Sequence, residues 1–387
     1  MSEFSVSVPQ WNNIPQLTVS GIAKLLPNNT VQLHTQLGHL IISLFDIGVR
    51  FQIGNNRDYN YEMLKKTPVP CNVDIASSEH STIITSNKTR LIIEHSPFSF
   101  RLLDDNKLIQ SSPKDGHFVR EFRLPPLAKT ENGWFISFDL GASEPIYGLG
   151  EKWGKLDKRG QLIRSYNHDA LGVNAEISYK NMPFCWSPNG WGIFVHTPAP
   201  VTHGVGYAPW SQRSYGVLVE DYCLDLFILK AANGKAMLDT FTELTGKAPT
   251  PPDWSLGVIL SKAYYKDVDE LMATAKAVRA HKMPCDVITL DGRAWQDTDT
   301  RFAFEWDKKR YTNPAAVLAE LKAMNFKICI WEYPMISVEN SLFTEFAKKG
   351  WLIKDKRTGE AFQYNWDMSA FGEVLTPLPK SGIVDFT

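Results

Sequence analysis

The stretch CDVITLDGRAWQDTDTRF, residues 285–302, joins a short apolar run to an abrupt polar end. The run Val287–Leu290 has the composition of a buried strand, and Asp291 and Trp295 follow it almost at once. A carboxylate, a glycine, an arginine and an indole therefore stand directly at the end of a predicted strand. The sequence on either side decides what kind of fold this strand belongs to.

The surrounding residues alternate between strand and helix patterns. SLGVILS (255–261) and KICIWEYP (327–334) are further apolar runs of strand length. Continuous apolar runs are typical of parallel strands that are buried on both faces. The length of the repeat fits βαβ units, so we predict that residues 255–387 form the first part of a (β/α)₈ TIM barrel.

Three helices are predicted in this region, at 267–283, 313–326 and 341–350. Asp267 at the N-cap position and Glu270 three residues later form a capping-box pattern. Asn313 can cap the second helix, and Pro314 suits its first turn.

Residues 1–246 have a different pattern. They contain many short segments rich in Val, Ile, Thr and aromatic residues, bounded by Asn, Asp, Gly or Pro. Phe98, Phe100 and Leu102 are two residues apart, which is the period of a strand with one buried face. Many short strands at this spacing predict a β-sandwich domain.

One helix and one boundary interrupt the strand pattern. Residues 233–246 have apolar positions at helical spacing, and Gly246 ends the run. The segment KAPTPPDW (247–254) contains three prolines, which cannot continue a helix or join a sheet interior. We therefore place the linker between the two domains there.

The overall composition excludes several classes of function. The 387 residues include 43% hydrophobic and 21% charged residues, and the formal net charge is −1. Without a basic cluster, we expect no nucleic-acid or anionic-membrane partner. No apolar run approaches the roughly 20 residues that span a bilayer. The 12% aromatic content, with 12 Trp, fits either a sugar-binding site or a large core.

The N-terminal residues and the cysteines indicate a cytoplasmic protein. The first residues, MSEFSVSVPQWNN, lack the charged and apolar regions of a secretory signal. The five cysteines are scattered, odd in number and mostly within apolar strands, at positions 71, 185, 223, 285 and 329. We expect reduced, buried thiols rather than disulfides or a zinc site, and we expect no metal.

Polar and aromatic residues follow each predicted barrel strand: Lys262 and Tyr264, then Asp291, then Trp331 and Glu332. In this fold the chemistry lies at the carboxyl ends of the strands. A carboxylate accepts hydrogen bonds from sugar hydroxyls, and aromatic rings pack on sugar C–H faces. Alternatively, Asp291 caps the following turn and Trp331 fills the barrel. Lys262 and Glu332 also fit purely structural roles.

Asp291 and Glu332 invite a second interpretation. On neighbouring strands they would stand about 5 Å apart, and retaining glycosidases hold two carboxylates at about that separation. Taken alone, this spacing nominates them as a catalytic pair.

Several motifs occur together in one order: YGLGEKWGKLDKRG (147–160), SYNHDA (165–170), YKNMPFCWSPNGWGIFVH (179–196), LTGKAPTPPDWSLG (244–257), FEWDKKRYTNP (304–314), LKAMNFKICIWEYP (321–334) and IVDFT (383–387). With these motifs the chain resembles glycoside hydrolase family 31, which includes α-glucosidases and α-xylosidases, and above all its bacterial α-xylosidases. The resemblance implies a galactose-mutarotase-like sandwich, a (β/α)₈ barrel and C-terminal β domains. It also implies retaining hydrolysis by two aspartates, without a cofactor.

The resemblance further implies roles for individual residues. Asp291 matches the strand-end aspartate that binds hydroxyls of the non-reducing sugar, and Trp331 and Tyr264 match aromatic residues that line the same subsite. Asp169, in SYNHDA, matches an aspartate on a sandwich loop that reaches over the barrel mouth. From its spacing alone, Asp169 would be a solvated turn residue.

The residues after Asp291 depart from those of better-known family members, because the chain reads GRAWQ there. Arg293 either favours an anionic or differently substituted sugar or is a salt-bridge partner. Arg293, Trp295 and Glu332 complete the predicted set of substrate-binding residues. The preferred sugar stays open.

The resemblance places the nucleophile and the acid/base beyond Thr387. Asp291 and Glu332 are then not the catalytic pair, and we expect an N-terminal fragment that is inactive alone and poorly soluble because half a barrel exposes an apolar edge. The full-length protein is expected to form homo-oligomers. Two other hypotheses remain: a non-catalytic sugar-binding or regulatory module, and a structural sandwich fragment without a ligand.

Overall fold

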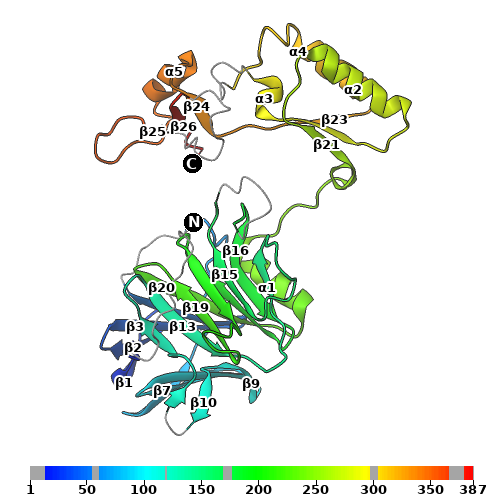
Figure 1. The fold of residues 1–387 in the computed structure, drawn as a ribbon. Helices are drawn as coiled ribbons and strands as arrows, with labels where there is room; N and C mark the ends of the chain where they lie inside the picture. Colours follow the sequence, from blue (N-terminus) through cyan, green and yellow to red (C-terminus); the bar gives the residue numbers. More distant parts are fainter. Residues whose placement is uncertain are drawn as a thin grey trace. The chain divides into compact units, whose positions relative to one another are not determined.

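The computed structural model describes residues 14–54, 61–117, 120–168, 177–296, 304–365 and 379–386. The chain forms two compact units, Met1–Ala248 and Pro249–Thr387 (Figure 1). The division between them falls within the proline-rich segment 247–254.

The N-terminal unit is built from antiparallel sheets. The largest contains, in spatial order, β1 (Val19–Leu25), β2 (Val31–Thr35), β3 (Gly38–Phe45), β4 (Gly48–Gly54), β20 (Cys223–Lys230), β17 (Trp191–Val195), β16 (Asn181–Ser187) and β14 (Tyr147–Gly150). A second contains β12 (Leu127–Lys129), β13 (Trp134–Asp139), β19 (Ser214–Val219), β18 (Val201–Val205) and β15 (Gln161–Ser165). A third contains β5 (Asp74–Ser77), β6 (Ser81–Ser86), β7 (Thr89–His95), β8 (Phe98–Asp104) and β9 (Lys107–Ser111). The short pair β10 (Lys114–His117) and β11 (Arg120–Phe122) completes the unit.

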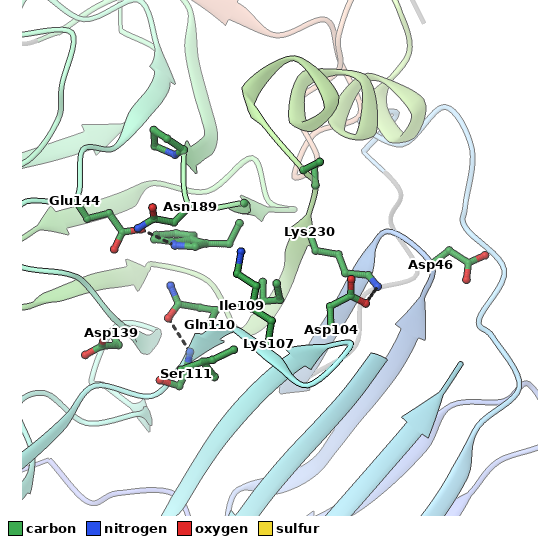
Figure 2. A pocket seen from close by; sticks show the side chains of 16 residues that line it. Asp46, Asp104, Lys107, Ile109, Gln110, Ser111, Asp139, Glu144, Asn189 and Lys230 are labelled. Atoms are coloured by element: carbon green, nitrogen blue, oxygen red, sulfur yellow. Dashed lines mark hydrogen bonds and ion pairs between the residues drawn. The ribbon is translucent and has the colours of Figure 1, made fainter. Parts of the chain in front are cut away.

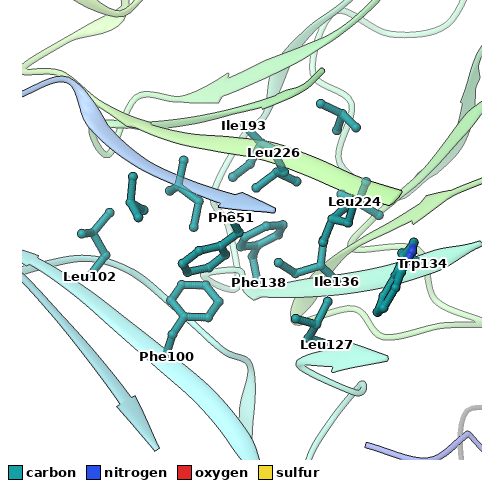
Figure 3. Close-up of a cluster of buried hydrophobic side chains, with 14 of the residues drawn as sticks. Phe51, Phe100, Leu102, Leu127, Trp134, Ile136, Phe138, Ile193, Leu224 and Leu226 are labelled. Atoms are coloured by element: carbon teal, nitrogen blue, oxygen red, sulfur yellow. The ribbon is translucent and has the colours of Figure 1, made fainter. Parts of the chain in front are cut away.

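One apolar core joins the three larger sheets (Figure 3). Phe51 of β4 meets Phe100 of β8 edge-on, with ring centres 5.4 Å apart, and Phe100 meets Phe138 of β13 at 6.0 Å. Phe98, Phe100 and Leu102 are all buried, as their two-residue spacing predicts. The sandwich prediction is confirmed.

The predicted helix of this unit forms as α1 (Gly234–Thr245). Asn233 caps it by accepting a hydrogen bond from the peptide N–H of Ala236, and Gly246 ends it. Phe241 stacks on Phe184 of β16 at 3.9 Å, so the helix covers a face of the eight-stranded sheet.

The C-terminal unit contains a three-stranded parallel sheet, β21 (Ile259–Lys262), β22 (Val287–Leu290) and β23 (Lys327–Ile330). Its helices are η2 (Asp253–Leu256), α2 (Val268–Ala280), α3 (Gly292–Trp295), α4 (Pro314–Ala323) and α5 (Ser341–Lys349). A small antiparallel sheet that the sequence did not predict contains β24 (Met335–Ser337), β26 (Ser381–Ile383) and β25 (Gln363–Tyr364).

The helix caps agree with the sequence except in one detail. Asp267 accepts a hydrogen bond from the N–H of Glu270 at 2.9 Å, and Asn313 accepts one from Ala316 at 3.1 Å. Glu270 does not return the bond to the N-cap residue. It accepts instead from the N–H of Lys266, one residue earlier, while its other oxygen pairs with Lys262.

Two burial predictions are wrong. Only the central strand β22 is buried on both faces, whereas Ile259 of β21 is 52% exposed and Ile330 of β23 is 39% exposed. The outer strands each have one neighbour in this sheet, and the α2 and α4 cluster covers one face. For the same reason Cys329 of β23 is exposed, while all five cysteines are free thiols and only Cys185 and Cys285 are buried.

Candidate functional site

The three parallel strands end at the same level. Lys262, Leu290 and Ile330 are paired across the sheet as the last residues of β21, β22 and β23. The peptide N–H of Trp331 donates to the carbonyl of Leu290 at 2.9 Å, which continues the pairing one step further. The residues that follow the strands are therefore gathered along one edge, as predicted for the mouth of a barrel.

Asp291 begins the one-turn helix α3 with an extended backbone, φ −62° and ψ 161°. Its carbonyl accepts from the N–H of Ala294 at 2.7 Å, but its side chain makes no capping hydrogen bond. Burial raises the pKa of Asp291 above its ordinary value, although the N–H groups of Gly292 and Arg293 and the charge of Arg293 act in the opposite direction. The carboxylate is half-buried and forms no side-chain cap hydrogen bond with α3.

The glycine after Asp291 makes room for an indole. A Cβ atom at Gly292 would lie 2.2 and 2.5 Å from two ring atoms of Trp331. Any larger residue would displace the ring from the turn that follows Asp291. Trp331 is half-buried, and its ring meets Tyr333 edge-on at 4.2 Å.

Trp295 supports Trp331 from inside the unit. It is only 6% exposed, and its indole N–H donates to the carbonyl of Trp331 at 2.9 Å. Its ring meets Trp306 edge-on at 5.2 Å. The structure therefore places Trp295 within the packing beneath the strand ends.

Glu332 is half-buried and its carboxylate is fully engaged. One oxygen accepts from the side-chain amide of Gln296, and the other accepts from the N–H of Tyr333 at 3.1 Å. Burial raises the pKa of Glu332, and these two hydrogen bonds lower it by less. These hydrogen bonds give the carboxylate of Glu332 a structural role, and its role in substrate binding stays a prediction.

Tyr264 follows β21, is 41% exposed and has two guanidinium groups near its ring. The Cζ atom of Arg293 is 5.8 Å from the centre of its ring, and that of Arg310 is 5.4 Å away. Arg293 lies within α3. It extends beside an aromatic ring at the strand ends.

Lys262 was also predicted among the residues at the strand ends. Lys262 pairs with Glu270 and lies 4.9 Å from the centre of the Tyr265 ring, so its charge is already matched. Asp169 lies outside the described residues, and its role stays a prediction.

A large cavity lies elsewhere in the chain. It occupies about 740 Å³ in the N-terminal unit (Figure 2), and none of the strand-end residues lines it. Its main charged groups already hold the sheets together: Lys230 pairs with Asp104, and Glu144 accepts from the indole N–H of Trp191 at 2.8 Å. We therefore locate the candidate site at the strand ends rather than in this cavity.

The sequence reasoning assigned no role to Asp307 or Arg310, although both stand in the motif FEWDKKRYTNP. They form an ion pair at 2.7 Å, and their side chains are 9% and 10% exposed. The Asp-x-x-Arg spacing was the available signal. What it could not show is that this pair lies against the turn that follows Asp291.

Comparison with known families agrees with the motifs. A model of the glycosyl hydrolases family 31 TIM-barrel domain matches residues 248–387. A model of the glycosyl hydrolase 31 N-terminal galactose mutarotase-like domain matches residues 40–203, so the two together cover most of the chain. The chain belongs to glycoside hydrolase family 31. Its fold is the family's mutarotase-like β-sandwich followed by the start of its TIM barrel, as predicted.

Individual family 31 relatives are similar over much of the chain. The α-xylosidase XylQ of Lactiplantibacillus pentosus is 31% identical over 250 residues, which are 64% of this chain and 31% of that protein. An α-xylosidase of Emericella nidulans is 28% identical over 366 residues, which are 92% of this chain and 42% of the relative. The structure of a dextranase of Flavobacterium johnsoniae complexed with glucose is 24% identical in sequence and superposes with a TM-score of 0.78. The match covers 96% of this chain and 44% of the dextranase chain.

This family 31 chain spans less than half the length of each of these relatives. Within its described residues, no helix is long and apolar enough to cross a bilayer. The same part of the chain contains no group of three His, Cys, Asp or Glu side chains that could hold a metal ion.

Proposed function

We propose that this chain supplies the non-reducing-end sugar subsite of a retaining α-glycosidase. The observation that carries the proposal is the position of the Asp291 carboxylate. Asp291 follows the middle one of three parallel strands that end at the same level, and its side chain forms no cap hydrogen bond with α3. Trp331 and Tyr264 provide aromatic surface on the same edge. A carboxylate that accepts hydrogen bonds from hydroxyl groups and rings that pack on C–H faces suit a sugar ring.

The proposal includes the position of the catalytic groups. The nucleophile and acid/base of the family are expected in polypeptide that follows Thr387, so that this chain alone does not hydrolyse glycosides. The exposed apolar residues Ile259 and Ile330 on the outer strands support a barrel that further strands complete. Two of the relatives above are named α-xylosidases, which makes a terminal α-linked xylose the first substrate to test.

Titration with xylose and with glucose tests the sugar subsite directly. We expect saturable binding by the intact chain, followed by calorimetry or by tryptophan fluorescence, and a loss of binding in Asp291→Ala. Equal heats from the two proteins would reject the subsite. Hydrolysis of p-nitrophenyl α-xyloside or α-glucoside by a soluble monomer of this chain would reject the proposed position of the catalytic groups.

A non-catalytic carbohydrate-binding or regulatory module is the second candidate. The strand-end residues support it equally, because sugar binding by Asp291, Trp331 and Tyr264 needs no catalytic carboxylate. The DNA downstream of codon 387 distinguishes the two candidates. A reading frame with the aspartate motif of the fourth strand supports the glycosidase, and its absence supports the module.

We also propose a cytoplasmic location. The five free cysteine thiols support it, since paired cysteines are typical of oxidising compartments. Fractionation of the producing cells with an antibody against the chain would test this. Recovery outside the cytoplasmic fraction would contradict it.

A further inference from the structure

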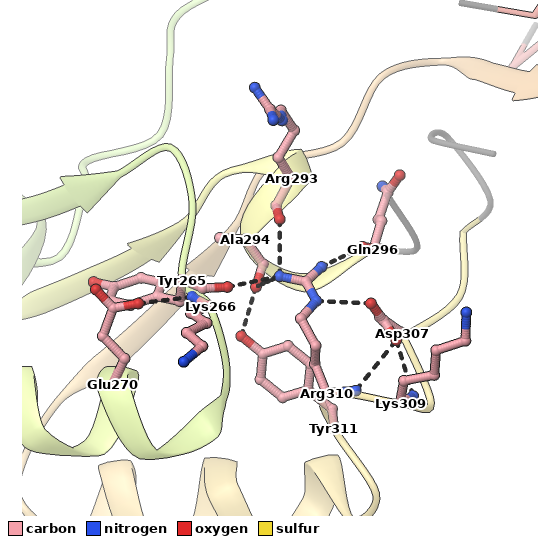
Figure 4. A network of polar contacts seen from close by, with 10 residues as sticks. All are labelled: Tyr265, Lys266, Glu270, Arg293, Ala294, Gln296, Asp307, Lys309, Arg310 and Tyr311. Atoms are coloured by element: carbon pink, nitrogen blue, oxygen red, sulfur yellow. Dashed lines mark hydrogen bonds and ion pairs between the residues drawn. The ribbon is translucent and has the colours of Figure 1, made fainter. Parts of the chain in front are cut away.

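Arg310 is the centre of a polar network beside the candidate site (Figure 4). Its guanidinium donates to the carbonyl of Tyr265 at 2.8 Å, of Arg293 at 3.0 Å and of Gln296 at 2.5 Å. Its Nε donates to Asp307, so the buried charge is neutralised. One side chain thus ties the residues after β21 to the turn after β22.

That turn, α3, cannot be stable by itself. A single turn of helix fixes several backbone angles for few hydrogen bonds, and its last carbonyls have no partner within the helix. Donors from the segment 307–311 supply partners to four successive carbonyl oxygens, those of Arg293, Ala294, Trp295 and Gln296. Arg310 donates to the carbonyls of Arg293, Ala294 and Gln296, and the peptide N–H of Asp307 donates to that of Trp295. The hydroxyl of Tyr311 also donates to the carbonyl of Ala294.

The residues held in this way are those of the proposed sugar subsite. Asp291 is the N-cap residue of α3, and Arg293 lies within α3. Tyr264 immediately precedes the Tyr265 carbonyl that Arg310 binds, and its ring lies beside the same guanidinium. A shift of α3 relative to the end of β21 would therefore change the distance between the carboxylate and the aromatic surface.

We propose that Arg310 is a positioning residue, which sets the geometry of the sugar subsite by fixing α3 to the end of β21. The inference rests on the proposed function for its link to sugar binding. It assigns to the Asp307–Arg310 pair a role in ligand affinity, although neither residue needs to touch the sugar. A guanidinium suits this role because its five donors form a rigid fork, whereas a lysine offers one compact ammonium group.

Arg279 is a natural control, since it makes a similar set of bonds at the opposite end of the sheet. It donates to the carbonyls of Met324, Cys285 and Asn325, at 2.7, 3.0 and 3.2 Å. Its guanidinium also lies 3.6 Å from the centre of the Phe326 ring. Loss of Arg279 should weaken the unit without moving α3.

The first experiment compares xylose titrations of the wild-type chain, Arg310→Lys and Arg279→Lys. Arg310→Lys is expected to raise the dissociation constant about tenfold or more, because misplaced binding groups lose much of their effect. Arg279→Lys is expected to lower the urea midpoint but leave the dissociation constant unchanged. Wild-type affinity in Arg310→Lys, or an equal loss in both variants, would overturn the inference.

Chemical rescue separates positioning from general damage. Arg310→Ala is titrated with and without guanidinium chloride at about 20 mM, far below denaturing concentrations, with NaCl as the ionic-strength control. We expect guanidinium, and not NaCl, to restore part of the affinity. No rescue in a variant that remains folded would count against Arg310 as the element that sets the subsite.

Hydrogen exchange tests whether Arg310 holds α3 in place, and it needs no sugar. In Arg310→Lys the amides of residues 290–296 should exchange faster, whereas Arg279→Lys should accelerate exchange near residues 281–287 instead. If the wild-type chain binds no xylose or glucose, the proposed function fails, and the exchange data still decide whether Arg310 holds α3. Unchanged protection of residues 290–296 in Arg310→Lys would reject the inference.

Discussion

The two ends of the parallel sheet β21–β22–β23 use the same kinds of residue for different purposes. Each end has an arginine that donates to backbone carbonyls, Arg279 at the amino end and Arg310 at the carboxyl end. Each also has a half-buried aspartate on β22, with Asp286 before the strand and Asp291 after it. At the amino end the bonds close the loops onto the strands, and at the carboxyl end they present a carboxylate beside aromatic rings.

The difference is consistent with the proposed division of the unit into an end that stabilises it and an end that binds sugar. Asp286 takes part in the sheet through its backbone, since its N–H donates to Val258 and its carbonyl accepts from Lys327, both at 2.9 Å. Asp291 is followed by a turn that other residues must hold in place. The carboxyl end therefore depends on side chains such as Arg310, and Asp291 is the carboxylate that we propose for the ligand.

Replacing the two aspartates in turn should give the largest contrast. Asp291→Ala is expected to weaken xylose or glucose binding about 10- to 100-fold, because hydrogen bonds to a charged group contribute about 1.5–3 kcal/mol. Asp286→Ala removes the same group from the same strand and should leave the dissociation constant unchanged. Calorimetric titration of both variants provides the measurement. A larger loss in Asp286→Ala would reverse the assignment of the two ends.

Two glycines give a second contrast, in stability. In Gly292→Ala the new methyl group would meet the rigid Trp331 ring at 2.2 Å, so we expect a loss of about 1–3 kcal/mol and a shifted indole emission. In Gly257→Ala the methyl group would meet the Asp286 side chain, at 1.9 Å from Oδ2, 2.6 Å from Cγ and 3.2 Å from Cβ, and the carboxylate can rotate away. We therefore expect a much smaller loss.

Urea unfolding followed by tryptophan fluorescence measures both glycine variants. The two positions have backbone angles that alanine can adopt, so the contrast depends on the neighbouring side chain. Equal destabilisation would show that the Trp331 ring is not fixed against the turn. That result would also weaken the proposal that this indole is part of the sugar subsite.

Local sequence signals predicted the elements of the fold well. Asp267 and Asn313 cap the helices whose starts they mark, because an N-cap depends on residues within one turn. The burial of β21 and β23 was predicted wrongly, since an apolar strand has the same composition whether or not a neighbour covers it. The exposed Ile259 and Ile330 show the difference.

The site was only partly predictable for a related reason. Asp291 and Trp331 were predicted at one edge because each follows a predicted parallel strand. No local signal linked Gly292 to the ring of Trp331, which lies 39 positions later in the chain. Trp295 was predicted to bind the substrate because it follows Asp291 closely. In the structure its indole N–H donates to the carbonyl of Trp331, which follows the third strand. The bonds of Arg310 go to backbone carbonyls, which carry no sequence signal at all.

The smallest predicted effect concerns pH, and it links the stability of the carboxyl end to its binding. Burial raises the pKa values of Asp291 and Glu332. A carboxyl group with a raised folded-state pKa contributes stability that is fully present below its unfolded pKa, about 4, and is lost as the pH rises through the folded value. The double variant Asp291→Asn, Glu332→Gln should therefore gain stability relative to the wild type between pH 4 and 7.

Urea midpoints of the two proteins across that range provide the measurement, and parallel curves would contradict the prediction. The gain should be small, because both carboxyl groups are partly solvated. Sugar affinity of the wild type should change in the opposite direction, since the ionised form of Asp291 is the better acceptor of hydroxyl hydrogen bonds and is lost on acidification. Opposite pH dependences of stability and affinity in one protein would assign both to the carboxyl groups that follow the strands.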